Sequence, residues 1–421
     1  MTEQMNVPKL RFDEFDGEWQ KLTLKQVSTK NISYGVVQTG DKDLIVPCVR
    51  VVDLTSGSLN RDTFIKTSEA INQSYKKTIL ESGELMVALR GVIGLTRAVP
   101  VDLVGCNLTR GIARISPDQK RFSSQFIEQA LNTPKSSQRF DQLKNGSALK
   151  EISIGELNKY STDYPYLPEQ QKIASFLSKV DEKITLLTEK KDKLAEYKKG
   201  VMQQLFNGKW EKQDGQLTFI PPTLRFKADD GSDFPDWEEV SLGDVLIPTF
   251  REVDKPSNNY LAIGVRSHCK GTFQKPDSEP DKVAMDKLYV VRAGDLIVNI
   301  TFAWEGAIAI VKDEDDGGYV SHRFPTYLFN EDRLLGSFFE SLFKQKRFRF
   351  DLDLISPGGA GRNRVLSKKE FLKLTVSVPS INEQKKISEG LTLLQQKLDL
   401  ANSELEKAKE WKKGLLQQMF V

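Results

Sequence analysis

The 421-residue chain contains one long internal repeat. Glu-Gln-Gln-Lys-Ile at 169–173 returns as Glu-Gln-Lys-Lys-Ile at 383–387, an offset of 214 residues. The same offset relates Tyr-Lys-Lys-Gly-Val-Met-Gln-Gln-Leu-Phe, which ends at Phe206, to Trp-Lys-Lys-Gly-Leu-Leu-Gln-Gln-Met-Phe, which ends at Phe420. Short periods are typical of solenoids and propellers, so a period this long indicates a duplicated domain. We therefore expect two similar halves related by a pseudo-two-fold internal repeat.

Two segments, 173–206 and 387–420, have the sequence pattern of long paired helices. Apolar residues recur in both at alternating steps of four and three, which is the heptad spacing of a coiled coil. Thirty-four residues at ~1.5 Å each give a rod of about 50 Å. We expect the two helices to pair with each other; the alternative is that each packs only on its own domain. The predicted seam consists of Ile173, Leu177, Val180, Ile184, Leu187, Leu194, Val201, Leu205, Ile387, Leu391, Leu394, Leu398, Leu405, Leu415 and Met419.

The rest of the chain has mixed α and β character. Short β-rich runs bounded by turn residues recur, as in 83–89 and 294–300, and helices are expected near 126–131 and 334–348. The stretch 207–223 contains Asn-Gly, Asp-Gly and Pro-Pro and is predicted to be a linker. The expected fold class is α+β: two mixed α/β domains separated by two long antiparallel coiled-coil helices. The predicted segments are a first domain at 1–166, a central helix at 167–206, a linker and second domain at 207–380, and a distal helix at 381–421.

Composition is ordinary for a soluble globular protein, with 39% hydrophobic and 28% charged residues and a net charge of +3. The three cysteines form no paired motif, which favours a reducing compartment. No apolar run approaches the ~18 residues of a membrane span. We expect a soluble, cytoplasmic protein.

Motifs for catalysis are nearly absent. The two histidines, His268 and His322, have no metal-spaced partners, so no metal site is expected. No Walker loop or nucleophile elbow is present. The acidic run 276–282 faintly resembles a nuclease signature, but a solvated turn is the simpler interpretation. The sequence predicts a non-catalytic protein.

Basic and polar residues near glycine-flanked loops are the candidates for ligand contact. Arg and Lys suit phosphates, and Arg with Asn or His can read base edges in a major groove. The alternative is that these are ordinary surface cations. The candidate DNA-binding residues are Arg50, Arg90, Lys150, Arg266, Ser267, His268, Lys270, Arg362, Asn363 and Arg364.

On these residues the chain resembles the DNA-specificity subunit of type I restriction-modification systems. The main carriers are two Pro-x-x-x-Glu-Gln segments, at 165–170 and 379–384, each leading into a helix that ends Lys-Lys-Gly-x-x-Gln-Gln-x-Phe. A second carrier is Arg-Ser-His-Cys-Lys-Gly at 266–271, which departs from the family pattern at Cys269, where glycine is usual. The first half has no counterpart of this loop.

The resemblance implies two target recognition domains, each contacting one half of a bipartite double-stranded DNA site. It also implies that the helix pair sets the gap between the halves and docks two modification (methyltransferase) subunits, which restriction (translocase and nuclease) subunits join. A rod of about 50 Å would cover roughly 15 base pairs of B-DNA. The resemblance places S-adenosylmethionine, ATP and Mg in the partners and no cofactor in this chain.

Three alternatives stay open. The chain could be the specificity subunit of another restriction-modification type, or a non-catalytic coiled-coil adaptor with no DNA role. It could also be a nuclease that uses Asp277 and Glu279.

Overall fold

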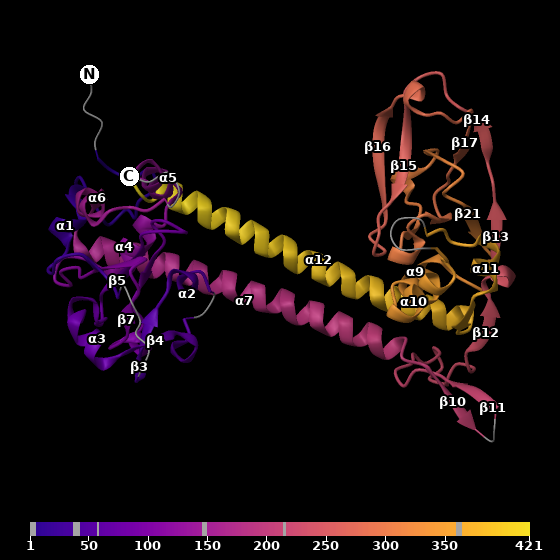
Figure 1. Ribbon diagram of the computed structural model, residues 1–421, viewed down its shortest axis with the longest axis horizontal. Coiled ribbons are helices and arrows are strands. Elements are labelled where there is room, and N and C mark those ends of the chain that lie inside the picture. The colour runs from indigo at the N-terminus through magenta and orange to yellow at the C-terminus, as the bar shows by residue number, and fades with distance from the viewer. Residues whose placement is uncertain (1–5, 37–42, 57–58, 145–149, 214–215, 359–363) are drawn as a thin grey trace. The chain divides into compact units, whose positions relative to one another are not determined.

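The computed structural model describes residues 6–36, 43–56, 59–144, 150–213, 216–358 and 364–421. These residues form two compact units (Figure 1). The first unit combines 1–189 with 402–421, and the second is the continuous segment 190–401.

The described residues of the first unit form three small sheets and six short α-helices in addition to its parts of the long helices. Its sheets have the strand orders β2-β8-β5-β6, β4-β3-β7 and β1-β9. The strands are β1 (Gln20–Thr23), β2 (Ser33–Tyr34), β3 (Leu44–Val49), β4 (Ile65–Ser68), β5 (Leu85–Ala88), β6 (Thr96–Ala98), β7 (Asn107–Leu108), β8 (Ile112–Ile115) and β9 (Ser161–Tyr164). The helices are α1 (Leu24–Val27), α2 (Val51–Leu54), α3 (Glu69–Ser74), α4 (Ser124–Leu131), α5 (Pro134–Gln142) and α6 (Ile154–Lys159).

The second unit repeats this plan with additions. The order β13-β21-β18-β19 matches the four-stranded sheet of the first unit, and β12-β22 matches β1-β9. The three-stranded sheet is replaced by the five-stranded order β14-β17-β20-β15-β16, in which β15 and β20 are parallel just as β3 and β7 are. The strands are β10 (Lys209–Gln213), β11 (Gln216–Ile220), β12 (Glu238–Ser241), β13 (Leu246–Thr249), β14 (Glu252–Asp254), β15 (Tyr260–Val265), β16 (Thr272–Ser278), β17 (Lys287–Val290), β18 (Leu296–Val298), β19 (Ile308–Ile310), β20 (Tyr319–Val320), β21 (Thr326–Phe329) and β22 (Thr375–Val378). The short helices are α8 (Leu242–Val245), α9 (Gly336–Phe343), α10 (Lys346–Leu354) and α11 (Lys368–Lys373).

Local sequence explains the helix pair that follows the sheet in the first unit. The side chain of Ser123 accepts a hydrogen bond from the backbone N–H of Phe126 and so caps α4. Phe126 and Ala130 lie one turn apart on its buried face. Pro134 then opens α5, where a missing N–H costs nothing. The helix expected near 126–131 is confirmed, and the one expected at 334–348 is present as two helices, α9 and α10.

The two long helices are α7 (Leu167–Leu205) and α12 (Ile381–Gln418). Each begins six residues before the heptad pattern, and Pro168 lies inside the first turn of α7. In the first unit the Phe176 and Trp411 rings meet edge-on, with centroids 6.2 Å apart. In the second unit the Lys198 ammonium donates a hydrogen bond to the side-chain oxygen of Gln395. The start of α7 thus meets the end of α12, and the end of α7 meets the start of α12. The expected antiparallel pairing is confirmed.

Both units complete their cores with a segment of long helix. In the first unit Leu415 and Met419 are buried with Trp19 and Phe126, and the backbone N–H of Leu10 donates to the carbonyl of Gln418 at 2.9 Å. In the second unit Leu205, the counterpart of Met419, is buried in the core. Residues 402–421 therefore contribute apolar side chains to the core of the first unit, as residues 190–205 do in the second unit.

The segment 207–223, which was predicted to be a linker, contains two strands. Strands β10 and β11 pair there as an antiparallel hairpin, with Gln213 opposite Gln216. Asp-Gly between two strand-like segments is a strong hairpin signal, but the composition of 207–223 was interpreted as that of a linker. Among the residues that the structure describes, no helix combines the length and apolar character needed to cross a bilayer.

Candidate nucleic-acid interface

The loop 266–271 joins β15 to β16 and has a fixed backbone. The N–H of Arg266 donates to the carbonyl of Gly271 at 2.9 Å. His268 and Cys269 both adopt left-handed conformations, with φ of 62° and 55°. Their N–H groups donate to the carbonyls of Glu305 and Gly306, both at 2.8 Å. Because the left-handed region favours glycine, the φ of Cys269 is compatible with the glycine that the resemblance implies at this position. The cysteine is accommodated, with its Sγ 3.6 Å from the carbonyl of Phe343.

The predicted contact residues of this loop fall into two kinds. The Arg266 guanidinium donates to the carbonyl of Thr272 at 2.5 Å and lies 5.0 Å from the ring centroid of Phe273. The Ser267 hydroxyl donates to Glu305 at 2.7 Å. These two side chains brace the loop. His268 and Lys270 are exposed and make no side-chain hydrogen bond or ion pair with another described residue, so the loop presents them to solvent.

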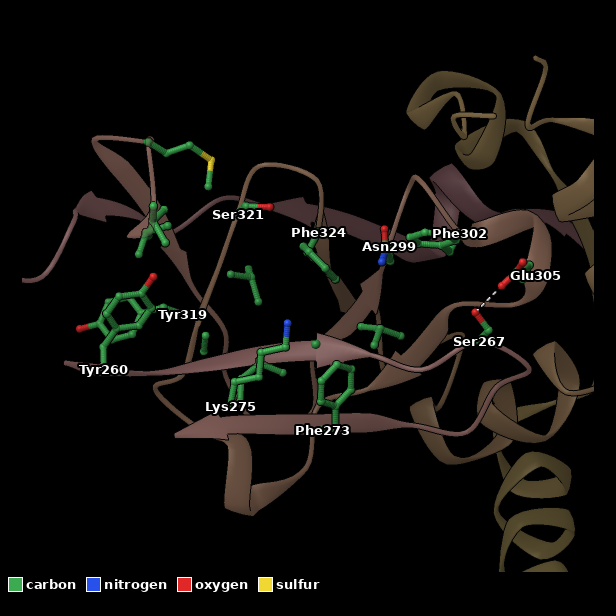
Figure 2. Close-up of a pocket in the computed structure, with 18 residues that line it drawn as sticks. Tyr260, Ser267, Phe273, Lys275, Asn299, Phe302, Glu305, Tyr319, Ser321 and Phe324 are labelled. Carbon is green, nitrogen blue, oxygen red and sulfur yellow. Dashed lines mark hydrogen bonds between the residues drawn. The ribbon is translucent and has the colours of Figure 1, made fainter. Parts of the chain in front are cut away.

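A hollow of about 480 Å³ lies beside the loop, lined by β15, β16, β20 and the segments around Asn299 and Phe324. Figure 2 shows Lys275 and Phe273 on one wall and the Ser267–Glu305 hydrogen bond at one end. Lys275 and Asn299 were not among the residues predicted from the sequence. Asn299 follows β18 within a strand motif that the sequence did reveal, whereas only the pairing of β16 with β15 places Lys275 here.

Arg364 holds the fold together, whereas Arg362 and Asn363 lie outside the described residues. The Arg364 guanidinium forms an ion pair with the carboxylate of Asp353 at 2.7 Å and donates to the carbonyl of Ser356 at 3.1 Å. It also lies 5.1 Å from the Trp304 ring centroid. These contacts tie the segment after α10 to the neighbouring turn, so the charge of Arg364 is largely occupied.

In the first unit the three predicted cations lie on neighbouring segments. Arg50 precedes α2 and grips Asp53 through Nε and Nη2, at 3.0 and 2.8 Å, and these hydrogen bonds raise the pKa of Arg50. Arg90 is exposed, and its backbone forms an isolated antiparallel β-bridge with that of Glu151. Glu151 directly follows Lys150, which is also exposed. A Cβ on Gly111 would lie 2.7 Å from the Arg90 Nε and 2.8 Å from a methyl group of Val51, which brings α2 and Arg90 together. The side chains of Arg90 and Lys150 are thus exposed to solvent, whereas that of Arg50 is hydrogen-bonded to Asp53.

All fifteen predicted seam residues of α7 and α12 are buried or half-buried. The opposite faces expose large apolar side chains at equivalent positions of the repeat. Leu186 is 58% exposed and Leu400 is 60% exposed. Tyr197 and Trp411 occupy a second pair of equivalent positions but lie beside the seam, since Trp411 meets Phe176 and Tyr197 lines a hollow with Leu394. Each long helix therefore has one exposed leucine at an equivalent position besides its inner seam.

The acidic run considered for a nuclease forms part of a strand. Pro276, Asp277 and Ser278 belong to β16, and Asp277 is exposed with φ of 55°. Within the described ranges, no group of three or more His, Cys, Asp and Glu side chains is placed to hold a metal ion.

Comparison with known proteins finds one matching family model, the type I restriction modification DNA specificity domain, over residues 17–196 and again over 235–410. The type I restriction enzyme EcoBI specificity subunit of Escherichia coli is 29% identical over 160 residues, which are 37% of this chain and 33% of that protein. The MjaVIII specificity subunit of Methanocaldococcus jannaschii is 23% identical over 294 residues, 64% of each protein. The chain thus spans between a third and two thirds of these curated relatives.

The fold has a relative among solved structures. The crystal structure of the S subunit of a type I restriction-modification system from M. genitalium matches 99% of both chains with a TM-score of 0.54 and 16% sequence identity. At that identity the likeness concerns the fold, and it covers both units and both long helices.

Proposed function

The chain belongs to the family of type I restriction modification DNA specificity domains, and on that basis we propose that it is the DNA-specificity subunit of a type I restriction-modification complex. The observation that carries this proposal is the duplication. The family model matches twice, and each match covers one sheet-based domain together with part of a long helix. Each unit contacts one half of a bipartite double-stranded site, and the helix pair sets the gap between the halves.

In the second unit the β15–β16 hairpin is the element that enters a groove. The major groove of B-DNA admits a two-stranded ribbon. His268 and Lys270 at its tip are free to contact bases or phosphates, whereas Arg266 and Ser267 keep the tip in shape. Lys275 extends the cationic surface along β16.

In the first unit Arg90 and Lys150 make the corresponding contacts, from segments beside α2. The two domains share the plan of their sheets but have different loops, as two dissimilar half-sites require.

The exposed leucines of the long helices, Leu186 on α7 and Leu400 on α12, dock two modification subunits. Exposed leucines at equivalent positions of a duplicated helix suit two copies of the same partner. Restriction subunits join that core. This chain determines which DNA sequence the complex binds. The partner subunits methylate DNA with S-adenosylmethionine and cleave it with ATP and Mg.

The proposal is tested by mapping methylated adenines in a host genome with and without this gene. We expect one bipartite sequence with a fixed gap to lose its methylation when the gene is removed, and an unchanged map would contradict the proposal. Exchange of one globular domain for that of a relative should change one half of the sequence only. Neighbouring genes for separate modification and restriction subunits distinguish type I from other restriction-modification types.

A further inference from the structure

The two units repeat one buried polar network at the start of each long helix. In the first unit Arg11 donates from Nε and Nη2 to the two carboxylate oxygens of Glu169, at 2.8 and 2.7 Å. In the second unit Arg225 makes the same bidentate contact with Glu383, at 3.0 and 2.6 Å. The Glu169 side chain is only 2% exposed and that of Glu383 is not exposed at all.

The glutamine that follows each glutamate extends the network. The amide nitrogen of Gln170 donates to the carbonyls of Pro165 and Arg121, at 2.8 and 3.1 Å. Its amide oxygen accepts from the N–H of Ser123 at 2.9 Å. Ser123 caps α4, so Gln170 ties the start of that helix to the start of α7.

Gln384 repeats these three bonds in the second unit. It donates to the carbonyls of Pro379 and Arg333, both at 2.9 Å, and accepts from the N–H of Leu335 at 2.9 Å. Leu335 directly precedes α9, just as Ser123 precedes α4. Both glutamines are fully buried.

Stability alone does not require such a network, because replacement of a buried ion pair by well-packed apolar side chains is often neutral or stabilising. Directional bonds do restrict geometry: a bidentate Arg–carboxylate pair and a fully bonded amide admit few orientations. The same bonds occur in two units whose loops differ, so they serve a requirement common to both domains.

We propose that these networks are joints that fix the orientation of each recognition domain on its own long helix and thereby restrict the gap length that the subunit accepts in DNA. Arg11, Glu169 and Gln170 form the first joint, and Arg225, Glu383 and Gln384 form the second. They are positioning residues that act through the domains and contact no DNA. The inference rests on the proposed function.

A change of one base pair in the gap shifts a half-site by about 3.4 Å and rotates it by about a tenth of a turn. If the joint is rigid, the domain cannot follow the displaced half-site, and binding to that DNA is weaker. If the joint is loosened, the domain can reorient, and the loss of binding is smaller. The variants Gln170→Met and Gln384→Met keep the side-chain length and remove the three hydrogen bonds. Arg11→Lys and Arg225→Lys keep the charge and lose the bidentate fork, so they loosen the joint more gently if the methionine variants fold poorly.

The experiment measures binding of the assembled complex to duplexes whose gap is native, one base pair shorter or one base pair longer. For each joint variant we expect the preference for the native gap to fall about tenfold, while the penalty for a wrong base within either half-site stays unchanged. Gln203→Met, the same change at an exposed position of α7, should leave the gap preference intact.

Weaker binding by the same factor at all three gaps would show that the network only stabilises the fold, and would overturn the inference. A wild-type complex without any gap preference would instead refute the proposed function itself.

Discussion

Arg225 holds the carboxylate of Glu383, a group with no exposed surface, at 2.6 Å, and this hydrogen bond raises the pKa of Arg225. Lys412 and Asp181 also form a close ion pair, at 2.5 Å, but their side chains are 24% and 39% exposed. The two ion pairs have similar distances and very different surroundings.

Arg225→Ala should therefore destabilise the protein far more than Lys412→Ala. Loss of the arginine leaves a buried carboxylate without its partner, which costs about 3–5 kcal/mol. Loss of the lysine leaves a carboxylate that water can reach, and costs about 0.2–1 kcal/mol. Urea unfolding of the two variants measures both values, and equal losses would contradict the argument.

Lys270→Ala should weaken DNA binding without affecting stability, because the side chain is exposed and has no partner among the described residues. If Lys270 neutralises one phosphate, the slope of log K against log salt should fall by about one. Arg364→Ala should have the opposite profile, with a lower melting temperature, because it breaks the contacts with Asp353 and Trp304. Anisotropy over a salt series and thermal melts separate the two effects.

Leu400→Asp and Leu186→Asp should each weaken docking of a modification subunit without unfolding the chain, since both side chains are already more than half exposed. Size-exclusion chromatography of the mixed subunits reports the stoichiometry of the complex. Gln396→Asp places the same charge at an exposed position of α12 and is the control. If the leucine variants assemble as the wild type does, the surfaces around Leu186 and Leu400 do not dock the modification subunits.

Glu128→Gln should stabilise the folded chain at neutral pH. Burial is the main cause that raises the pKa of Glu128 above its usual 4.5, against the effect of a hydrogen bond from the Ala98 N–H. A raised pKa means that the folded state favours the protonated acid. The stability from this group is therefore present at low pH and is lost as pH rises through the folded pKa. The gain from glutamine should be largest near pH 7 and shrink below pH ~4.5. Melting temperatures across that range provide the test.

Cys48 should resist alkylation in the folded protein. Burial is the main cause that raises the pKa of the Cys48 thiol to about 12, and burial also raises the pKa of Cys106. The thiolate is the reactive form, so almost none is present at pH 8. Mass spectrometry after iodoacetamide treatment should find both residues modified only in denaturant.

Local patterns in the sequence were sufficient to predict the repeat and the two long helices. The heptad spacing fixes which face of α7 is buried, and the Gly-bounded run at 294–300 marks β18. The heptad pattern begins only at Ile173, six residues after the start of α7, because the first turns carry polar Glu169 and Gln170, which an apolar pattern does not register. Their burial depends on Arg11 and on the start of α4, both distant in sequence.

The roles of individual cations could not be predicted in the same way. Lys270 and Arg364 are both basic residues near glycines, yet one faces solvent and the other meets Asp353 and Trp304. That difference depends on where α10 and the turn at 303–305 come together. Lys275 was missed for a related reason, since only strand pairing brings it beside the hollow.

The make-up of the first unit has a consequence for biosynthesis. Residues 402–421, which complete the first unit, leave the ribosome after the whole of 190–401. The first unit therefore begins to be translated first but cannot finish folding until after the second unit has been synthesised. Until then, the apolar surface that later covers Leu415 and Met419 faces water or a chaperone, while the continuous second unit already has every residue it needs.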